Sequence, residues 1–567
     1  MLTLAAISGP LPHLGVIIGP LAAGCALLAP GRHKRALAML ITMALGFTLL
    51  LADVWDSPHL RPFHHHPLYA VVLAVAGLVA LALGGALFRA LPWLIAPLAV
   101  LTLPFRIPIT TGGTTSNLLL PLYCVIACAA VAYALPMLFP ALARLPGLSG
   151  AAPDLSFPGL GSLRELNAAA EPGSQASRKP LLVEKLLCAF VLLYGIQLLY
   201  SPGAVHLLHG VQVNGAGGHL RGSLRSALPL PSGFEKGLQN EIFFYMPFLL
   251  LFSLLRELRW SRQLLSICIC LTAALAVIFS FIGFAEHLAG HLLLSSKLTE
   301  SDELHRYFAV NSVFFDPDIF GRYLALTMVL LVAALLFSGS TRIELLSCLV
   351  LVILWACLIL TFSRSSILAL LLGMGLLAAL RWRARWMLYA AAAVVVLGVV
   401  IVATHYHTFV PNLNTASSGR SNLISGGLHL FGQRPLQGWG SGAFTHEYTR
   451  AYPVAARSVA DSHTIFVTVL CEQGLIGAAL YLALITTALY TLFRGAHNSG
   501  LRVALAATFA ALILHTELYA DFLEDPTSWV LLAIGVALAS DPRCWRRPSA
   551  AGAAVTPGSA MSAGALT

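Results

Sequence analysis

Apolar runs long enough to cross a membrane recur along the chain, separated by short polar segments. A spanning helix needs about 20 mostly apolar residues, and this criterion predicts about fifteen spans. They lie near 14–30, 36–52, 68–88, 91–106, 117–139, 181–200, 241–255, 264–284, 318–338, 343–362, 364–381, 386–404, 465–493, 503–520 and 527–540. The fourth is short and contains Pro92 and Pro97, so we expect a broken or re-entrant segment there. Because lipid offers no partner to backbone polar groups, runs of this length are helices, and the predicted fold class is an all-α polytopic membrane bundle.

Polar intervals between the apolar runs suggest how the chain is organised. The interval 141–180 is rich in Gly, Pro, Ala and Ser and indicates a flexible linker. The interval 405–462 is the longest between late apolar runs, and we expect it to form a large helical external loop. The predicted organisation is N-terminal spans (1–140), a cytoplasmic linker (141–180), central spans (181–404), the external loop (405–462), C-terminal spans (463–541) and a low-complexity, disordered cytoplasmic tail (542–567).

Lysine and arginine in the short loops predict the orientation. One set of alternate loops carries the basic clusters, including RHKR at 32–35, RELRWSR at 256–262, RWRAR at 381–385 and RCWRR at 543–547. This side is therefore predicted to be cytoplasmic, with the N-terminus outside and the C-terminus inside. The first apolar run begins near His13 without a basic segment before it, which favours a span over a cleaved signal peptide.

Composition narrows the classes of function. The chain of 567 residues is 58% hydrophobic and only 10% charged, which excludes a soluble domain with a single anchor. Its net charge of +10 follows the membrane topology, and no basic-aromatic patch points to nucleic acid. Most of the cysteines lie inside apolar runs and indicate no disulfide framework. No phosphate-binding glycine loop for a nucleotide is present in the sequence.

Lone arginines on the predicted external side run against the usual charge bias. They are Arg221, Arg225, Arg306, Arg322, Arg364 and Arg420. Arg322 and Arg364 lie at the outer ends of apolar runs, where an ionisable residue indicates function by default. Snorkelling to the headgroups is the alternative for any single arginine. Arginine's planar fork binds phosphate oxygens with paired hydrogen bonds, so the group favours an anionic, lipid-linked substrate.

His463 stands where the external loop gives way to a span, in the segment DSHTIFVTVLCEQGLIGAALYL. An imidazole that titrates near pH 6.5 is suited to accept a proton from a substrate hydroxyl. Asp461, Ser462 and His463 are also suited to cap the helix that starts at Thr464, and the spacing alone leaves both interpretations open. Gly474 and Gly477 favour close helix packing over substrate contact.

Three weaker patterns have ordinary structural explanations. The His64–His66 run could bind a metal, but a solvated polar run is the preferred interpretation. Asp316 and Asp318 flank Pro317 and favour a turn at the start of a span over a cation site. A solvated loop is the default for an acidic group near the C-terminus, made up of Glu517, Asp521, Glu524 and Asp525.

Residues from about 240 to 540 resemble the O-antigen ligase and O-antigen polymerase superfamily of bacterial membrane glycosyltransferases. Four segments carry the resemblance: VNSVFFDPDIFGRYL (310–324), TFSRSSIL (361–368), GRSNLISGGLHLFGQRPLQGWGSGAF (419–444), and His463 with Gly474 and Gly477. In the first segment, Asp316-Pro317-Asp318 replaces the family's Asn-Pro-Asn. In the fourth, Thr464 follows the histidine where the family usually has Asn, Ser or Gln. The first five spans have no recognisable counterpart in the family.

The resemblance implies a GT-C-like, metal-independent, inverting glycosyltransferase without a cofactor, located in the bacterial cytoplasmic membrane with its active site outside. The implied donor is a polyprenyl-diphosphate-linked glycan, and the acceptor is a hydroxyl of a glycan or glycolipid, in surface polysaccharide or lipopolysaccharide biosynthesis. His463 and Arg420 would be catalytic, and Arg364, Ser363, Arg306 and Arg322 would bind the diphosphate while Asp461 orients the histidine. A chain-extending polymerase is the alternative enzyme, and a polysaccharide or small-solute transporter is the alternative outside the enzyme class.

Overall fold

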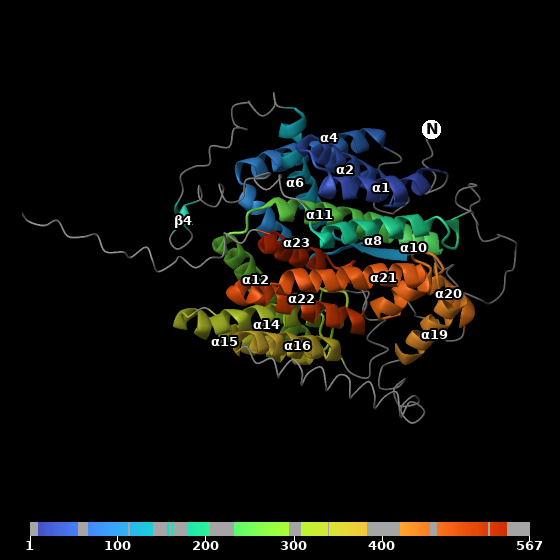
Figure 1. Cartoon of the computed structure of the whole chain (residues 1–567). Helices are drawn as coiled ribbons and strands as arrows, with labels where there is room; N and C mark the ends of the chain where they lie inside the picture. Colours follow the sequence, from blue (N-terminus) through green and yellow to red (C-terminus); the bar gives the residue numbers. More distant parts are fainter. Residues whose placement is uncertain are drawn as a thin grey trace, which may run out of the picture.

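The computed structural model is a bundle of long helices that run side by side (Figure 1). It describes residues 10–54, 66–111, 114–139, 156–157, 161–162, 180–204, 232–293, 308–337, 339–382, 420–453, 462–519 and 522–540. Ten helices in these ranges are long and apolar enough to cross a membrane, and three shorter apolar helices accompany them. The predicted class, a multi-pass helical membrane protein, is confirmed.

The elements follow one another in the order of the predicted spans. The N-terminal part contains α1 (Pro10–Leu28), α2 (Arg32–Val54), α4 (Pro67–Ala90), η1 (Pro92–Leu94), α5 (Ile95–Thr102), β1 (Ile107–Thr111), β2 (Thr114–Leu118) and α6 (Leu120–Leu138). The short strands β3 (Ser156–Phe157) and β4 (Gly161–Ser162) form a second hairpin. The central part contains α8 (Leu182–Leu198), α10 (Gly233–Asn240), the π-helical turn η3 (Glu241–Tyr245), α11 (Met246–Glu257), α12 (Arg262–Ala289), α14 (Pro317–Phe337), α15 (Thr341–Leu360) and α16 (Arg364–Trp382). The remaining elements are α19 (Arg420–Gln433), α20 (Phe444–Ala451), α21 (Ile465–Phe493), η4 (Ala496–Asn498), α22 (Gly500–Leu518) and α23 (Pro526–Ser540).

Each predicted span within the described residues coincides with a helix, whereas the span expected near 386–404 lies outside them. The fourth span is short, as its prolines predict: α5 ends at Thr102. It is followed by an antiparallel hairpin, with Ile107 paired to Leu118 and Thr111 to Thr114, which the helical prediction missed. The β-branched residues of ITT and TT favour extended backbone here. Of the linker predicted at 141–180, the structure describes only the β3–β4 hairpin and Pro180.

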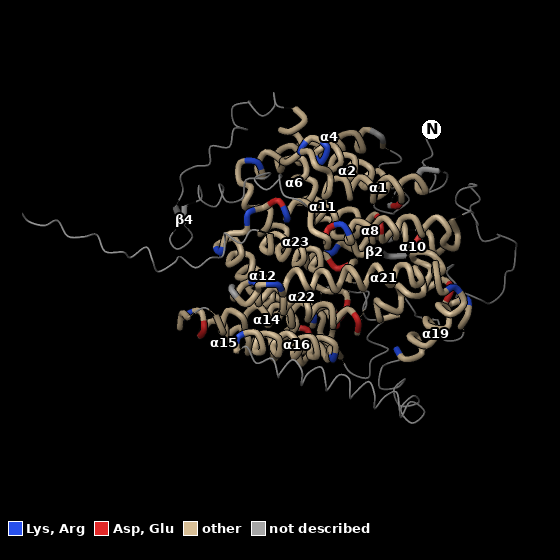
Figure 2. The backbone as a smooth tube through the Cα atoms, viewed as in Figure 1, with Lys and Arg blue, Asp and Glu red and all other residues tan. Residues whose placement is uncertain are grey.

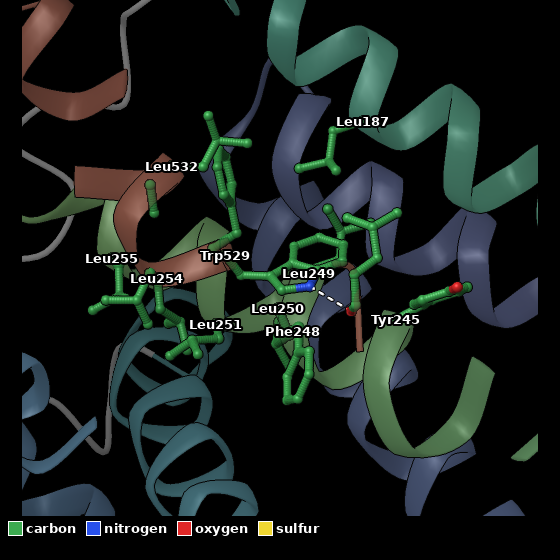
Figure 3. Close-up of a cluster of buried hydrophobic side chains, with 14 of the residues drawn as sticks. Leu187, Tyr245, Phe248, Leu249, Leu250, Leu251, Leu254, Leu255, Trp529 and Leu532 are labelled. Atoms are coloured by element: carbon green, nitrogen blue, oxygen red, sulfur yellow. Dashed lines mark hydrogen bonds between the residues drawn. The ribbon is translucent and has the colours of Figure 1, made fainter. Parts of the chain in front are cut away.

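The centre of the bundle is an apolar core in which α11 packs against α23 (Figure 3). The ring centroids of Phe248 and Trp529 lie 6.2 Å apart in an edge-to-face arrangement. The indole N–H of Trp529 donates to the carbonyl of Leu523 at 2.8 Å, so the polar atom of this fully buried side chain is satisfied. The C-terminal helix is therefore fixed to the middle of the bundle.

Buried ion pairs connect the first spans to the central spans. Arg256 pairs with Glu184, and Arg35 pairs with Glu257 at 2.5 Å, joining α2, α8 and α11. Both arginines belong to the basic loop clusters that predict orientation, but the structure buries them. Lone charges in lipid are costly, so each is matched by a carboxylate.

One end of the bundle gathers the starts of α14, α16 and α21 and the end of α22. We call this the outer end, after the orientation that the basic loops predict. The helices α19 and α20, from the predicted external loop, also lie at this end (Figure 1). Figure 2 shows charged residues both near helix ends and within the bundle.

Candidate functional site

The candidate site is organised around Asp318 in the first turn of α14. Asp316 accepts a hydrogen bond from the Asp318 backbone N–H at 2.7 Å, which fixes the turn that starts the helix. The carboxylate of Asp318 accepts from Ser363 Oγ at 2.5 Å and Ser365 Oγ at 3.2 Å, at the start of α16. The turn interpretation is confirmed for Asp316. For Asp318 it is incomplete, because its side chain connects α14 to α16.

Behind Asp318, two serines face a buried histidine of α22. His515 Nε2 lies 3.2 Å from Ser365 Oγ and 3.1 Å from Ser366 Oγ, and the histidine is fully buried. Gly321 of α14 permits this close contact, because a Cβ there would meet Ser366 Oγ at 2.7 Å. The starts of α14 and α16 and the end of α22 are thus joined by side-chain hydrogen bonds.

The guanidinium of Arg420, from α19, contacts the cluster formed by Asp318, Ser363, Ser365, Ser366 and His515. Its guanidinium donates to Asp318 Oδ2 at 3.0 Å and to the carbonyl of Leu518 at 2.8 Å, and its side chain is 31% exposed. A guanidinium has five N–H donors, and the contacts within the described residues use two of its nitrogens. Arg420 is therefore held in place while part of its fork stays accessible to a ligand.

Tyr519 connects Arg420 to His463. Its ring centroid lies 5.9 Å from the Arg420 Cζ atom, 5.7 Å from the His463 ring and 6.0 Å from the His515 ring. His463 is half-buried and has a positive φ of 55°. The hydroxyl of neighbouring Ser462 accepts from the Thr464 N–H at 3.1 Å, so the serine supplies the polar contact at the start of α21.

The other residues singled out from the sequence have different surroundings. Arg364 begins α16 at the outer end and its side chain is exposed. Arg322 is 2% exposed and pairs with Asp525 at 2.7 Å, so its charge is already balanced by the protein. Arg306 and Asp461 lie outside the described residues.

The acidic group near the C-terminus is not a solvated loop, contrary to the prediction. Asp525 pairs with Arg322, and Glu517 accepts from the Tyr481 hydroxyl at 3.0 Å. Glu524 accepts from the side-chain amide of Asn240 at 2.8 Å, whereas Asp521 lies outside the described residues. These carboxylates are bound by neighbouring helices because the chain turns back into the bundle after α22. Within the described ranges, no three His, Cys, Asp or Glu side chains are grouped to hold a metal ion, and His64 and His65 lie outside those ranges.

A glycine-rich loop, residues 434–442, holds the external helices against α21. The helix opens at Gly474, which has φ 64° and ψ −160°. There Trp439 N donates to the Cys471 carbonyl at 3.0 Å and Gly440 N donates to the Glu472 carbonyl at 2.8 Å, while Leu475 N donates back to the Pro435 carbonyl at 2.8 Å. Gly474 therefore permits a close approach, as predicted, but its partner is this loop and not another helix.

Side chains strengthen the attachment of the loop. The Glu472 carboxylate accepts from the backbone N–H groups of Gly442 at 2.9 Å and Phe444 at 3.1 Å, at the start of α20. Within α20, burial raises the pKa of the Tyr448 hydroxyl, so it stays protonated at neutral pH. These contacts position the external helices and, through α19, Arg420.

Replacing Gly474 with alanine should loosen this attachment. The backbone conformation at Gly474 is essentially confined to glycine and costs an L-residue about 1–3 kcal/mol. The new Cβ would also collide with the Leu436 carbonyl. We expect a lower thermal unfolding temperature in detergent and faster proteolysis around α19. Gly432→Ala is the matched control, because a Cβ at Gly432 meets open space. Equal stability of the two variants would contradict the attachment role.

Comparison with known protein families gives a match to a segment that contains part of the candidate site. Residues 349–482 match the family model described as O-antigen ligase. Over this segment the chain is similar to the O-antigen ligase family. The matched O-antigen ligase domain contains α16, α19 and α20 and most of α21, and with them Ser363, Arg364, Arg420 and His463. The resemblance predicted for 240–540 is confirmed over this part, and no curated protein matches the chain.

Three members of the cluster were not predicted as site residues: Asp318, His515 and Tyr519. All three lie outside the O-antigen ligase match, and the last two belong to the end of α22 and the turn after it. The Asp-Pro-Asp triplet is a usable signal for Asp318, but the preferred interpretation of it was a turn at the start of a span. A lone histidine and a lone tyrosine near the end of an apolar run offer no comparable signal.

Proposed function

We propose that this protein is a membrane glycosyltransferase of the O-antigen ligase type. It moves a glycan from a polyprenyl-diphosphate donor to a hydroxyl of a glycan or glycolipid acceptor, at the outer face of the bacterial cytoplasmic membrane. One observation carries the proposal: Arg420 and His463 both lie within 6 Å of the Tyr519 ring, at the end where α14 and α16 begin. This proximity supports a phosphate-binding role for Arg420 beside a proton-accepting role for His463.

Arg420 and the exposed Arg364 are the groups that would bind the diphosphate. In this displacement the bond from the sugar's anomeric carbon to the phosphate oxygen breaks, and negative charge develops on the leaving diphosphate. A fixed cation or donor at such a position is worth about 3–4 kcal/mol in the transition state. Asp318 keeps the Arg420 guanidinium aligned at 3.0 Å, and Ser363 fixes Asp318 in turn. The carboxylate therefore orients the arginine and leaves the rest of its fork for phosphate oxygens.

His463 would activate the acceptor. Its imidazole takes the proton of the acceptor hydroxyl while that oxygen bonds to the anomeric carbon from the face opposite the diphosphate. The configuration at that carbon is then inverted, no metal is required, and polyprenyl diphosphate leaves. General-base catalysis of this kind contributes about 10²–10⁴ in rate. The role of Asp461 as a partner that orients His463 remains part of the proposal.

Purified protein in detergent, given a polyprenyl-diphosphate oligosaccharide and a candidate acceptor, tests the proposal. We expect glycan transfer without a membrane gradient and without sensitivity to a metal chelator. A single transfer supports a ligase, whereas a ladder of products on the lipid carrier would assign the chain-extending polymerase instead. Failure to consume the donor with either kind of acceptor, combined with solute uptake in proteoliposomes, would replace the enzyme with a transporter.

A further inference from the structure

A cavity of about 100 Å³ lies between α5, α12, α14, α22 and α23. Its walls are mainly apolar, with Val100, Leu265, Leu326 and Val530 contributed by four different helices. A water molecule needs roughly 10–15 Å³ of such volume, so the space is several times larger than one water site. The cavity has room for a short stretch of one hydrocarbon chain.

The cavity reaches the candidate site along α14. Ile319 and Arg322 line it, and they follow Asp318 by one and four residues on the same helix. At the opposite end of the helices, Leu265 lines it near the start of α12. The space therefore extends from just below the Asp318 cluster toward the other side of the bundle.

Three charged side chains line the cavity: Arg106, Arg322 and Asp525. The Arg322–Asp525 pair, 2.7 Å apart, is internally neutral. Arg106 lies over the ring of Phe315 at 5.0 Å, at the level of the turn that precedes α14. No described carboxylate forms an ion pair with Arg106, and its side chain is partly exposed. The outer end of the cavity therefore carries one excess positive charge.

We propose that this cavity receives the first isoprenoid units of the polyprenyl-diphosphate donor, with Arg106 attracting the diphosphate above them. This inference rests on the proposed function and adds a role for the N-terminal spans, since α5 supplies one wall. The lining residues all lie outside the matched segment 349–482, so the family match does not assign the cavity. An apolar channel beneath a cation complements a single chain attached to phosphate. A phospholipid with two acyl chains fits a space of this size poorly.

Photo-crosslinking tests the proposal without requiring catalysis. The probe is a glycan-free polyprenyl diphosphate with a diazirine on the isoprene unit next to the phosphates. We expect crosslinked peptides from α5 and α14 in the purified full-length protein. Leu103→Trp, just after α5, should reduce crosslinking about tenfold by filling the space, whereas Leu101→Trp, two residues earlier and not lining the cavity, should not. Arg106→Gln, at a partly exposed position, should reduce it about fivefold by removing the cation.

The outcomes of this experiment distinguish a wrong cavity assignment from a wrong enzyme assignment. Crosslinks elsewhere in the protein, unchanged in Leu103→Trp and Arg106→Gln, would overturn the cavity assignment. Competition by excess phosphatidylglycerol as strong as that by unlabelled polyprenyl diphosphate would show a general lipid site, and would also overturn it. Glycan transfer measured on the same preparations separates the two proposals. Transfer with misplaced crosslinks refutes the cavity assignment alone, and crosslinks at α5 and α14 without any transfer refute the proposed enzyme.

Discussion

His463→Ala should lower the turnover number for glycan transfer by about 10²–10⁴, with little change in KM for the donor. The imidazole is proposed to take the acceptor's proton, a step that matters in the transition state and not in donor binding. Initial rates of product formation at saturating donor and acceptor measure this loss. The variant's thermal unfolding temperature should stay close to that of the wild type, because the Ser462 hydroxyl accepts from the Thr464 N–H at the start of α21 and is kept in the variant.

His429→Ala is the control for this prediction. His429 lies on α19 at the same end of the molecule, and its exposed ring hydrogen-bonds to the Gln433 side chain at 3.2 Å. Its removal should leave transfer unchanged. Turnover above a tenth of the wild-type value in His463→Ala would mean that another group accepts the proton, and the proposed role of the histidine would be lost.

Arg420→Ala should reduce the turnover number by about 10²–10³, the usual effect of removing one donor to a developing negative charge. Arg420→Lys should recover only a part of this loss. An ammonium keeps the charge but cannot bind Asp318, the Leu518 carbonyl and a phosphate oxygen in the arrangement that the planar fork permits. The measurement is kcat and KM against donor concentration for both variants.

Arg450→Ala provides a matched charge removal on α20. Its side chain is 72% exposed and reaches Glu447 only at 3.8 Å. Transfer by this variant should equal that of the wild type. If Arg450→Ala and Arg420→Ala lose the same activity, the general field of the external helices and not a specific phosphate contact explains the effect.

Span positions could be predicted because the length of apolar runs in lipid is a simple constraint. The helices α12, α14, α15 and α16 begin and end within a few residues of the predicted runs. The β1–β2 hairpin could not be predicted in the same way, since ten residues rich in threonine have no strong hydrophobic period. The buried pairs of Arg35 with Glu257 and of Arg256 with Glu184 were also hidden, because a loop arginine and a buried one look alike in the sequence.

The sequence indicates candidate site residues where an arginine stands at an unusual position, on the predicted external side or inside an apolar run, because a charge there is energetically costly. Arg420, on the predicted external side, does contact the cluster at the outer end of the bundle. Arg322 met the same criterion but pairs with Asp525, a partner about two hundred residues away that no local pattern reveals. His515 comes from the end of α22 and Tyr519 from the turn after it, and only packing brings them against α14, α16 and α19. Local patterns in the sequence thus predict the helices and single candidate residues, but they do not predict which distant segments come into contact.

The attachment of residues 434–442 to the opened turn of α21 is made largely by main-chain atoms. Such an attachment is indifferent to most side chains on the solvent side of α19 and α20, provided that the glycines at the contact are kept. New side chains can therefore accumulate on these helices without moving Arg420 away from Asp318. The solvent side of these helices is therefore free to vary in sequence while the contact of Arg420 with Asp318 stays constant.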